Sequence, residues 1–311
     1  MRATVLLLLA GALALTGCEI ADVTTVDGED VVIVEGVLEA GAMTQRLILH
    51  RSVRRGAAGP PPLAEVSIAS GEGTLALRER APEECVDLAE GAEPPPIACY
   101  VGDSTLAPFV VPGGEYELRV RYAGEREMSG RTMVPGSFAL RLPGVDVSPG
   151  ETGRCVLPAG RELILSWTRA EGAWSYLGQL EIFGLREALP ELADDLPEVL
   201  RLTGLSISEE DTTMTLPRDF GLFQRGQIST PVLLALRDGL PPNASARLTL
   251  AALDRNYVNG IRGGAFNPSG TVRVPSVSGD GTGVFGSMVP LRLEILADDV
   301  GSRGTPSCVD P

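Results

Sequence analysis

The chain has 311 residues, of which 44% are apolar and 5% aromatic, and it contains 37 glycines and 24 prolines. This apolar fraction excludes global disorder, and the length suits one large domain or two ordinary ones. The formal charge is -15, because 41 acidic residues outnumber 26 basic ones, all of them arginine. Excess acid repels phosphate backbones, so the composition argues against nucleic-acid binding.

Residues 1–17 have the pattern of an export signal. Arg2 is followed by an apolar run over residues 5–15, which ends in Leu15-Thr16-Gly17-Cys18. The ending resembles the bacterial lipobox, which implies cleavage before Cys18 and lipidation of that cysteine. An ordinary secretory signal with a chance cysteine is the alternative. Two or three acyl chains would anchor the mature protein to a membrane without crossing it, because each buried methylene contributes ~0.8 kcal/mol.

Residues 18–30 are expected to form an acidic, flexible tether, which contains Glu19, Asp22, Asp27, Glu29 and Asp30. The residue directly after Cys18 is not aspartate, which is compatible with sorting to the outer membrane. Acidic residues at this position also resemble a surface-export signal of some bacterial groups, although they equally suit a solvated tether. We expect a protein anchored to the outer membrane, on its periplasmic face or at the cell surface.

Four cysteines remain once Cys18 is set aside: Cys85, Cys99, Cys155 and Cys308. An even number in an exported chain indicates disulfides, with three possible pairings. We favour Cys85–Cys99, which closes a proline-rich loop and stabilises by ~3 kcal/mol on the chain-entropy model. Cys155 then pairs with Cys308. A zinc site is the alternative, but the sequence has no Cys-x-x-Cys pair and no histidine near these cysteines.

Residues 31–142 are expected to form an N-terminal β-sandwich of the immunoglobulin-like or transthyretin-like kind. In residues 116–122 every second side chain is charged, which is typical of a strand with one buried and one wet face. Glycine, proline and acidic clusters separate such runs at hairpin spacing. The predicted strands are residues 31–39, 46–53, 64–69, 74–78, 108–111, 116–122 and 138–142.

Residues 143–153 are loop-like, so a second β-sandwich-like domain is placed over residues 143–311. Its predicted strands are residues 161–167, 174–183, 247–253, 270–274 and 289–296. Residues 185–205 have leucines near helical spacing, broken by Pro190 and Pro197, and predict an insertion of two short helices. The insertion either forms a binding surface or covers the open end of its own sheet.

Three short segments carry a family resemblance: Val34-Glu35-Gly36, Ala64-Glu65-Val66-Ser67-Ile68 and Pro112-Gly113-Gly114-Glu115-Tyr116-Glu117-Leu118. The last two resemble elements of carboxypeptidase-regulatory-like, or transthyretin-like, sandwiches. Together with the lipobox, they resemble a family of bacterial lipoproteins, a domain of unknown function, often encoded beside TonB-dependent outer-membrane receptors. Later segments also fit that family, namely Leu253-Asp254-Arg255-Asn256-Tyr257, Asn267-Pro268 and residues 281–286. The resemblance implies an accessory lipoprotein that works with a transporter, and it supplies no catalytic residues.

The residues themselves offer little for catalysis. His50 is the one histidine, it is expected on an exposed strand face, and no nucleophile elbow, P-loop or H-E-x-x-H motif occurs. The acidic groups Glu209-Glu210-Asp211 and Asp298-Asp299 could bind calcium or serve glycoside hydrolysis, but acidic turns are usually only solvated. No cofactor, metal site or enzymatic activity is therefore expected.

Two further segments invite a binding interpretation. Residues 278–283 are glycine-rich but lack the strand–helix context that holds phosphate, so we expect a flexible loop leading into Val284-Phe285. Trp167, Trp174 and Tyr176 could stack on a ligand, although scarce aromatics more often anchor a core. The sequence thus favours a non-catalytic accessory or ligand-binding partner of a TonB-dependent receptor. The alternative is a structural or adhesive envelope module without a transporter partner.

Overall fold

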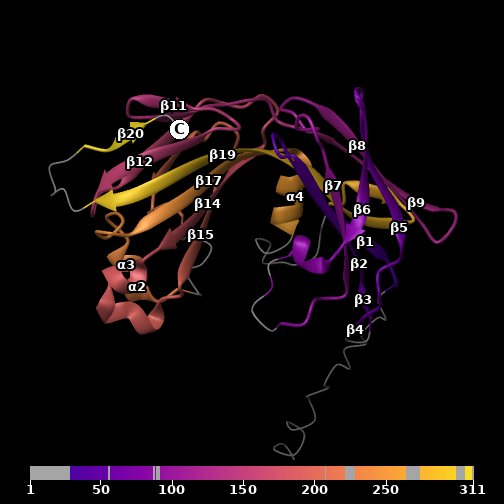
Figure 1. Ribbon diagram of the computed structural model, residues 1–311, viewed down its shortest axis with the longest axis horizontal. Helices are drawn as coiled ribbons and strands as arrows, with labels where there is room; N and C mark the ends of the chain where they lie inside the picture. The colour runs from indigo at the N-terminus through magenta and orange to yellow at the C-terminus, as the bar shows by residue number, and fades with distance from the viewer. Residues whose placement is uncertain are drawn as a thin grey trace, which may run out of the picture.

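A computed structural model describes residues 29–54, 57–86, 88, 92–206, 208–220, 228–263, 274–298 and 305–309. The strands form two β-sandwiches, and one long strand runs from one to the other (Figure 1). The predicted mainly β class, with a second β-rich domain that carries a short helical insertion, is therefore confirmed. The signal peptide, Cys18 and residues 18–28 of the tether lie outside the described residues.

The N-terminal sandwich combines the first third of the chain with a segment close to its end. Its elements are β1 (Val32–Glu39), β2 (Thr44–Arg51), β3 (Val53–Arg54), β4 (Ala57–Ala58), β5 (Ala64–Ser70), β6 (Gly73–Arg80), η2 (Pro82–Glu84), β7 (Ile97–Asp103), β8 (Glu115–Tyr122), β9 (Arg126–Met133), β18 (Val277–Gly279) and part of β19 (Gly281–Asp298). One layer has the order β19-β1-β2-β7 and the other β5-β8-β9-β18, while β6 pairs with both β5 and β7.

The alternation in β8 shows how the sequence builds this sandwich. Tyr116, Leu118, Val120 and Tyr122 are buried, and the charged residues between them face outward. Because successive side chains of a strand point to opposite faces, this pattern fixes which face of the sheet meets the core.

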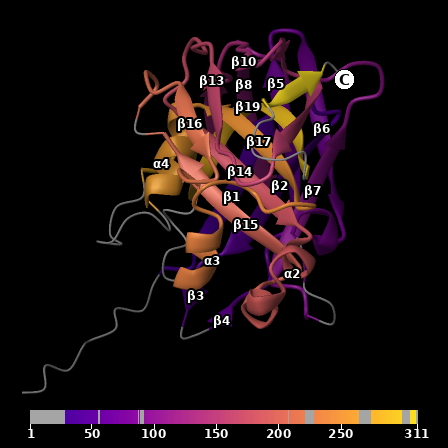
Figure 2. The ribbon, with the colours of Figure 1, turned by 90° about the vertical axis from the view of Figure 1, so that its left-hand side faces the viewer.

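The second sandwich has a large sheet in the order β15-β14-β17-β19-β12-β20 and a 4-stranded sheet in the order β11-β10-β13-β16. Its elements are β10 (Leu140–Leu142), β11 (Val145–Val147), β12 (Thr152–Pro158), β13 (Leu163–Trp167), β14 (Ser175–Phe183), α2 (Leu185–Ala188), η3 (Pro190–Asp195), β15 (Val199–Leu205), β16 (Thr213–Leu216), α3 (Thr230–Ala235), β17 (Ser245–Leu253), α4 (Arg255–Gly263) and β20 (Ser307–Val309). Figure 2 shows α2 and α3 at one end of it. No helix in the described part of the chain is long and apolar enough to cross a membrane.

Strand β19 belongs to both sandwiches. Residues 281–288 pair in parallel with β1, and residues 288–296 pair antiparallel with β17. Helix α4 lies beneath the bridging part of the strand, between the two bodies (Figure 1). One continuous cluster of buried residues runs through both sandwiches, so no break in the apolar core separates them.

The strand pairing differs from the sequence division at residue 143. That division assigned β18 and all of β19 to the second domain, whereas β18 pairs with β9 and the start of β19 pairs with β1. Local composition could not reveal this arrangement, because the partners lie more than 100 residues apart in sequence.

The glycine-rich segment is a strand junction and not a flexible loop. Residues 278–283 include the end of β18 and the start of β19. Gly283 has φ +149°, and a Cβ there would overlap the carbonyl oxygen of Val34 on β1. Glycine is required because β1 and β19 approach each other closely at this point.

Two other predicted elements are wrong in part. Residues 108–111 form no strand; Val111 N–H donates to the Tyr116 hydroxyl, which donates to the Phe109 carbonyl. Residues 185–195 contain the two predicted short helices, but residues 199–205 form β15, because their alternating side chains pair with β14. Of the predicted strand over 270–274, residues 270–273 lie outside the described residues and Val274 is not in a strand.

Candidate functional site at the junction of the two sandwiches

A buried carboxylate lies where the two sandwiches meet. Asp254 follows β17 directly and is 4% exposed. It begins α4: Tyr257 N–H donates to Asp254 Oδ1 at 2.9 Å, as expected of an N-cap aspartate. Asp254 Oδ1 also accepts from Ser287 N–H of β19 at 3.0 Å, and Oδ2 accepts from the Thr132 hydroxyl of β9 at 2.7 Å. One side chain therefore joins α4, β19 and the N-terminal sandwich.

The hydroxyl groups around Asp254 form a directed chain. Thr132 Oγ1 lies 2.8 Å from Ser287 Oγ, and both side chains are buried. Because the Thr132 proton goes to the carboxylate, the one Ser287 hydroxyl proton is shared between Thr132 Oγ1 and the Met133 carbonyl oxygen, which lies 3.4 Å from Ser287 Oγ. Burial raises the pKa of Asp254 above the usual carboxyl value, and the hydrogen bonds from Ser287 and Thr132 oppose that rise.

Two neighbouring contacts close the junction. Asn256 Nδ2 donates to the Arg131 carbonyl at 2.7 Å and to the Phe285 carbonyl at 3.0 Å, so α4 binds both β9 and β19. Gly286 lets the helix start come close, because a Cβ there would lie 2.8 Å from Tyr257 N. The two sandwiches are thus held by strand pairing, apolar burial and saturated polar groups.

A cleft of about 290 Å³ opens beside this network. Its lining includes Arg131 and Met133 of β9, and Trp174, Arg255 and Glu115 around them. The Arg255 guanidinium lies 4.8 Å from the centroid of the Trp174 ring, a cation–π contact. We call this surface the junction cleft. It combines an aromatic face, a thioether and two guanidinium groups, which suits binding rather than bond-breaking chemistry.

The disulfides have the pairing favoured from the sequence. Cys85 is bonded to Cys99, and Cys155 to Cys308. The second bond joins β12 to β20, whose backbones also pair. Among the described residues no group of three or more His, Cys, Asp or Glu side chains is arranged to hold a metal ion.

The remaining sequence candidates lie apart from the junction cleft. His50 is on β2, partly exposed, with Nε2 3.4 Å from Glu35 Oε1. Glu209 lies 3.5 Å from Arg169, in a turn before β16. Asp298 ends β19, and Asp299 lies outside the described residues. The structure brings none of these described groups to a shared site.

The aromatic residues divide between core and surface. Trp167 and Tyr176 are buried and pack edge to face at 5.2 Å, as the core interpretation predicts. Trp174 is 44% exposed, so that interpretation is wrong for it. The signal for the site was present in the segment Asp254-Arg255-Asn256-Tyr257, but its role depends on β9 and β19, which are distant in sequence.

The helical insertion covers its own sheet. Leu185 of α2 and Leu196, just after η3, are buried in the common core, and Leu189 and Leu192 pack against it. This arrangement agrees with the covering role, and it leaves few of the leucines for a partner.

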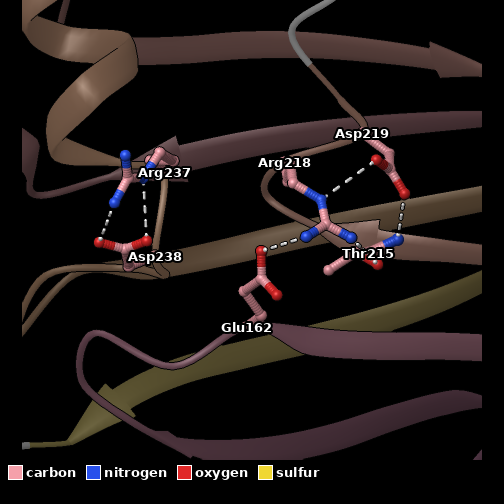
Figure 3. Close-up of polar contacts among 6 residues, drawn as sticks. All are labelled: Glu162, Thr215, Arg218, Asp219, Arg237 and Asp238. Carbon is pink, nitrogen blue, oxygen red and sulfur yellow. Dashed lines mark hydrogen bonds and ion pairs between the residues drawn. The ribbon is translucent and has the colours of Figure 1, made fainter.

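A second set of polar contacts lies in the second sandwich, beside the ends of β13, β16 and α3 (Figure 3). Arg218 Nη1 is 3.2 Å from Glu162 Oε1, and Arg218 Nη2 donates to Thr215 Oγ1 at 3.2 Å. Asp219 Oδ2 accepts from Thr215 N–H at 2.7 Å, while Arg237 pairs with the adjacent Asp238. Arg218, Asp219 and Thr215 fix the turn after β16 and Glu162 joins it to β13, while Arg237 and Asp238 form a separate pair.

Comparisons with known proteins identify no family for this chain. No protein-family model matches it, and no curated protein sequence matches it. Similar solved structures include the FN1–FN3 domains of chicken CNTN1, with 11% identity, 88% of this chain and 67% of that chain covered, and a TM-score of 0.19. A DUF4785 family protein from Legionella pneumophila has 12% identity, coverage of 70% and 51%, and a TM-score of 0.23. Salmonella alpha-2-macroglobulin has 14% identity, coverage of 88% and 15%, and a TM-score of 0.22.

Proposed function

We propose that the protein is a non-catalytic lipoprotein of the bacterial outer membrane that binds a TonB-dependent receptor, or a ligand for that receptor. The observation that carries the location is the lipobox at Leu15-Thr16-Gly17-Cys18. Two disulfides support an oxidising compartment, because disulfides persist outside the reducing cytosol.

The receptor partner comes from the resemblance of the sequence to lipoproteins encoded beside such receptors, and membership of that family is part of the proposal. The junction cleft supports a binding role, because tryptophan, methionine and arginine are the residues enriched in the energetic centres of protein interfaces. The two joined sandwiches would present this surface as a fixed unit on a short tether.

The anchor is tested by mass spectrometry of the protein purified from its native membrane. We expect a mature N-terminus at Cys18 that carries two or three acyl chains, and recovery in the outer-membrane fraction. The Cys18→Ala variant should lose both the lipid and the membrane association. An unmodified Cys18 in a soluble protein would contradict the anchor.

The partner is tested by mild crosslinking in intact envelopes, followed by solubilisation and identification of the crosslinked protein. A TonB-dependent receptor in stoichiometric amount supports the accessory role. A lipidated protein recovered alone would reject that role and leave a structural or adhesive display module as the account. Disrupting the receptor gene should not change lipidation, which keeps the two tests separate.

A further inference from the structure

The junction cleft exposes apolar side chains that the fold itself does not need. Trp174 is 44% exposed and Met133 is 55% exposed, whereas Trp167, the other tryptophan, is buried. An exposed aromatic ring provides contact area that costs little entropy to order on binding, and the flexible thioether beside it can adapt to the shape of a partner. The apolar part of the cleft therefore has the composition of an interface centre.

The same cleft carries positive charge in a strongly acidic protein. The Arg255 side chain is exposed, and in the described part of the chain it makes no ion pair; its contact is the ring of Trp174. The Arg131 side chain is 72% exposed and shares Glu117 with Arg119. Glu115 is the one exposed carboxylate of the lining, while Asp254 is buried and saturated by donors. The exposed side chains of the cleft therefore carry more positive than negative charge.

The volume of the cleft indicates what it can hold. A space of about 290 Å³ is at the low end of pockets that enclose a whole small ligand. It suits one or two side chains of a polypeptide whose remaining length lies along the outside. Electrostatic complementarity then selects a segment with carboxylates on either side of an apolar residue.

We propose that the junction cleft is the docking site for an acidic, extended segment of a partner protein. One apolar side chain of that segment packs on Trp174 and Met133, and its carboxylates bind Arg255 and Arg131. The proposal rests on the proposed function only in taking a protein as the partner, and the receptor itself is not part of it.

The test uses two synthetic peptides, Glu-Glu-Phe-Glu-Glu and its neutral counterpart Gln-Gln-Phe-Gln-Gln, with the mature protein. Trp174 is the exposed tryptophan, so tryptophan fluorescence reports binding directly. We expect the acidic peptide to change the fluorescence saturably and the neutral peptide to bind at least about fivefold more weakly. The Trp174→Phe variant should lose the signal, and rising salt should weaken binding.

The Arg255→Gln variant separates the charge from the apolar contact. We expect it to weaken binding of the acidic peptide about fivefold and to leave binding of the neutral peptide unchanged. Arg141→Gln is the matched control, because Arg141 is exposed on β10, away from the cleft lining. Equal binding of both peptides, or equal effects of the two variants, would overturn the proposal. A receptor missing from the crosslinking experiment would leave this peptide result unaffected, so the two failures are distinguishable.

Discussion

The two polar networks of this protein use similar groups in opposite settings. Around Asp254, a carboxylate, two hydroxyls and backbone amides are buried where the sandwiches meet. Around Arg218, a guanidinium and two carboxylates form contacts (Figure 3) in which the side chains of Arg218, Asp219 and Glu162 are 57%, 43% and 34% exposed; we call this the rim network. Water can replace a lost partner in the second network but not in the first. Burial, and not the number of contacts, decides which network holds the molecule together.

The buried network also joins residues that lie farther apart in the sequence. The hydrogen bonds of Asp254 link residues 122 and 33 positions apart in sequence. The hydrogen bonds of Thr215, Arg218 and Asp219 link residues within one turn, and the ion pair of Arg218 with Glu162 spans 56 positions inside the second sandwich. A change at the junction should therefore affect both sandwiches, whereas a change at the rim should stay local.

The largest effect is expected from Gly283→Ala, which attacks the shared strand itself. The new Cβ would collide with the Val34 carbonyl, so β1 and β19 would have to separate. We expect a loss of about 3–5 kcal/mol in the free energy of unfolding, measured by denaturant titration. Gly41→Ala is the control, because Gly41 also has positive φ but open space around its Cα; it should cost about 1 kcal/mol. Equal losses of stability in the two variants would show that the close approach of β1 and β19 does not set the cost at Gly283.

Asp254→Ala should come next. It leaves the Ser287 and Tyr257 amides without their acceptor, and the Thr132 hydroxyl must turn to Ser287 Oγ. We expect a loss of about 2–4 kcal/mol, since buried donors then lack any partner. The matched exposed variant, Asp219→Ala, should cost no more than about 1 kcal/mol. A larger loss of stability for Asp219→Ala than for Asp254→Ala would mean that the exposure of the carboxylate does not decide the size of the effect.

The pH dependence of stability provides a second test of the burial of Asp254. Burial raises the pKa of Asp254 in the folded state above the unfolded value of about 3.9. The contribution of this pKa shift to the free energy of unfolding is therefore fully present below the unfolded pKa of Asp254, and it is lost as the pH rises through the folded pKa. As the pH rises from the unfolded to the folded pKa of Asp254, the wild type should therefore lose stability relative to the Asp254→Asn variant. Denaturant titrations at a series of pH values measure it, and a shift in favour of wild type would refute the sign.

The smallest effect is expected from Arg218→Ala. It removes the partly exposed ion pairs with Glu162 and Asp219 and one hydrogen bond to the buried Thr215 hydroxyl. We expect a loss below about 1 kcal/mol that shrinks further at high salt. Thermal unfolding at low and high ionic strength provides the check. A large, salt-independent loss would show that the rim network carries more of the fold than its exposure indicates.

Local patterns in the sequence were sufficient for much of the fold. The alternation in β8 predicted its buried face, and cysteine spacing favoured the two disulfides that are present. Strand β9 was missed because residues 126–133 contain two methionines and no other large apolar side chain. The short β10 was placed two residues too early, since Phe138 is buried outside a strand.

The junction cleft was beyond the reach of sequence periodicity. Thr132 of β9, Trp174 before β14 and Asp254 after β17 come from three distant parts of the chain, and only strand pairing brings them together. The glycine-rich segment was assigned to a loop because glycine usually marks turns, and its real constraint is the close approach of β1. Cys18 and its lipid remain predictions from the lipobox.

Native-state hydrogen exchange, read by mass spectrometry, tests most directly whether the two sandwiches form one unit. We predict that the slowest amides of β2 and of β13, one from each sandwich, open with the same free energy. We also predict that Gly283→Ala lowers both by the same amount, because β19 is shared. A loss of protection confined to β2, with β13 unchanged, would contradict a single unit.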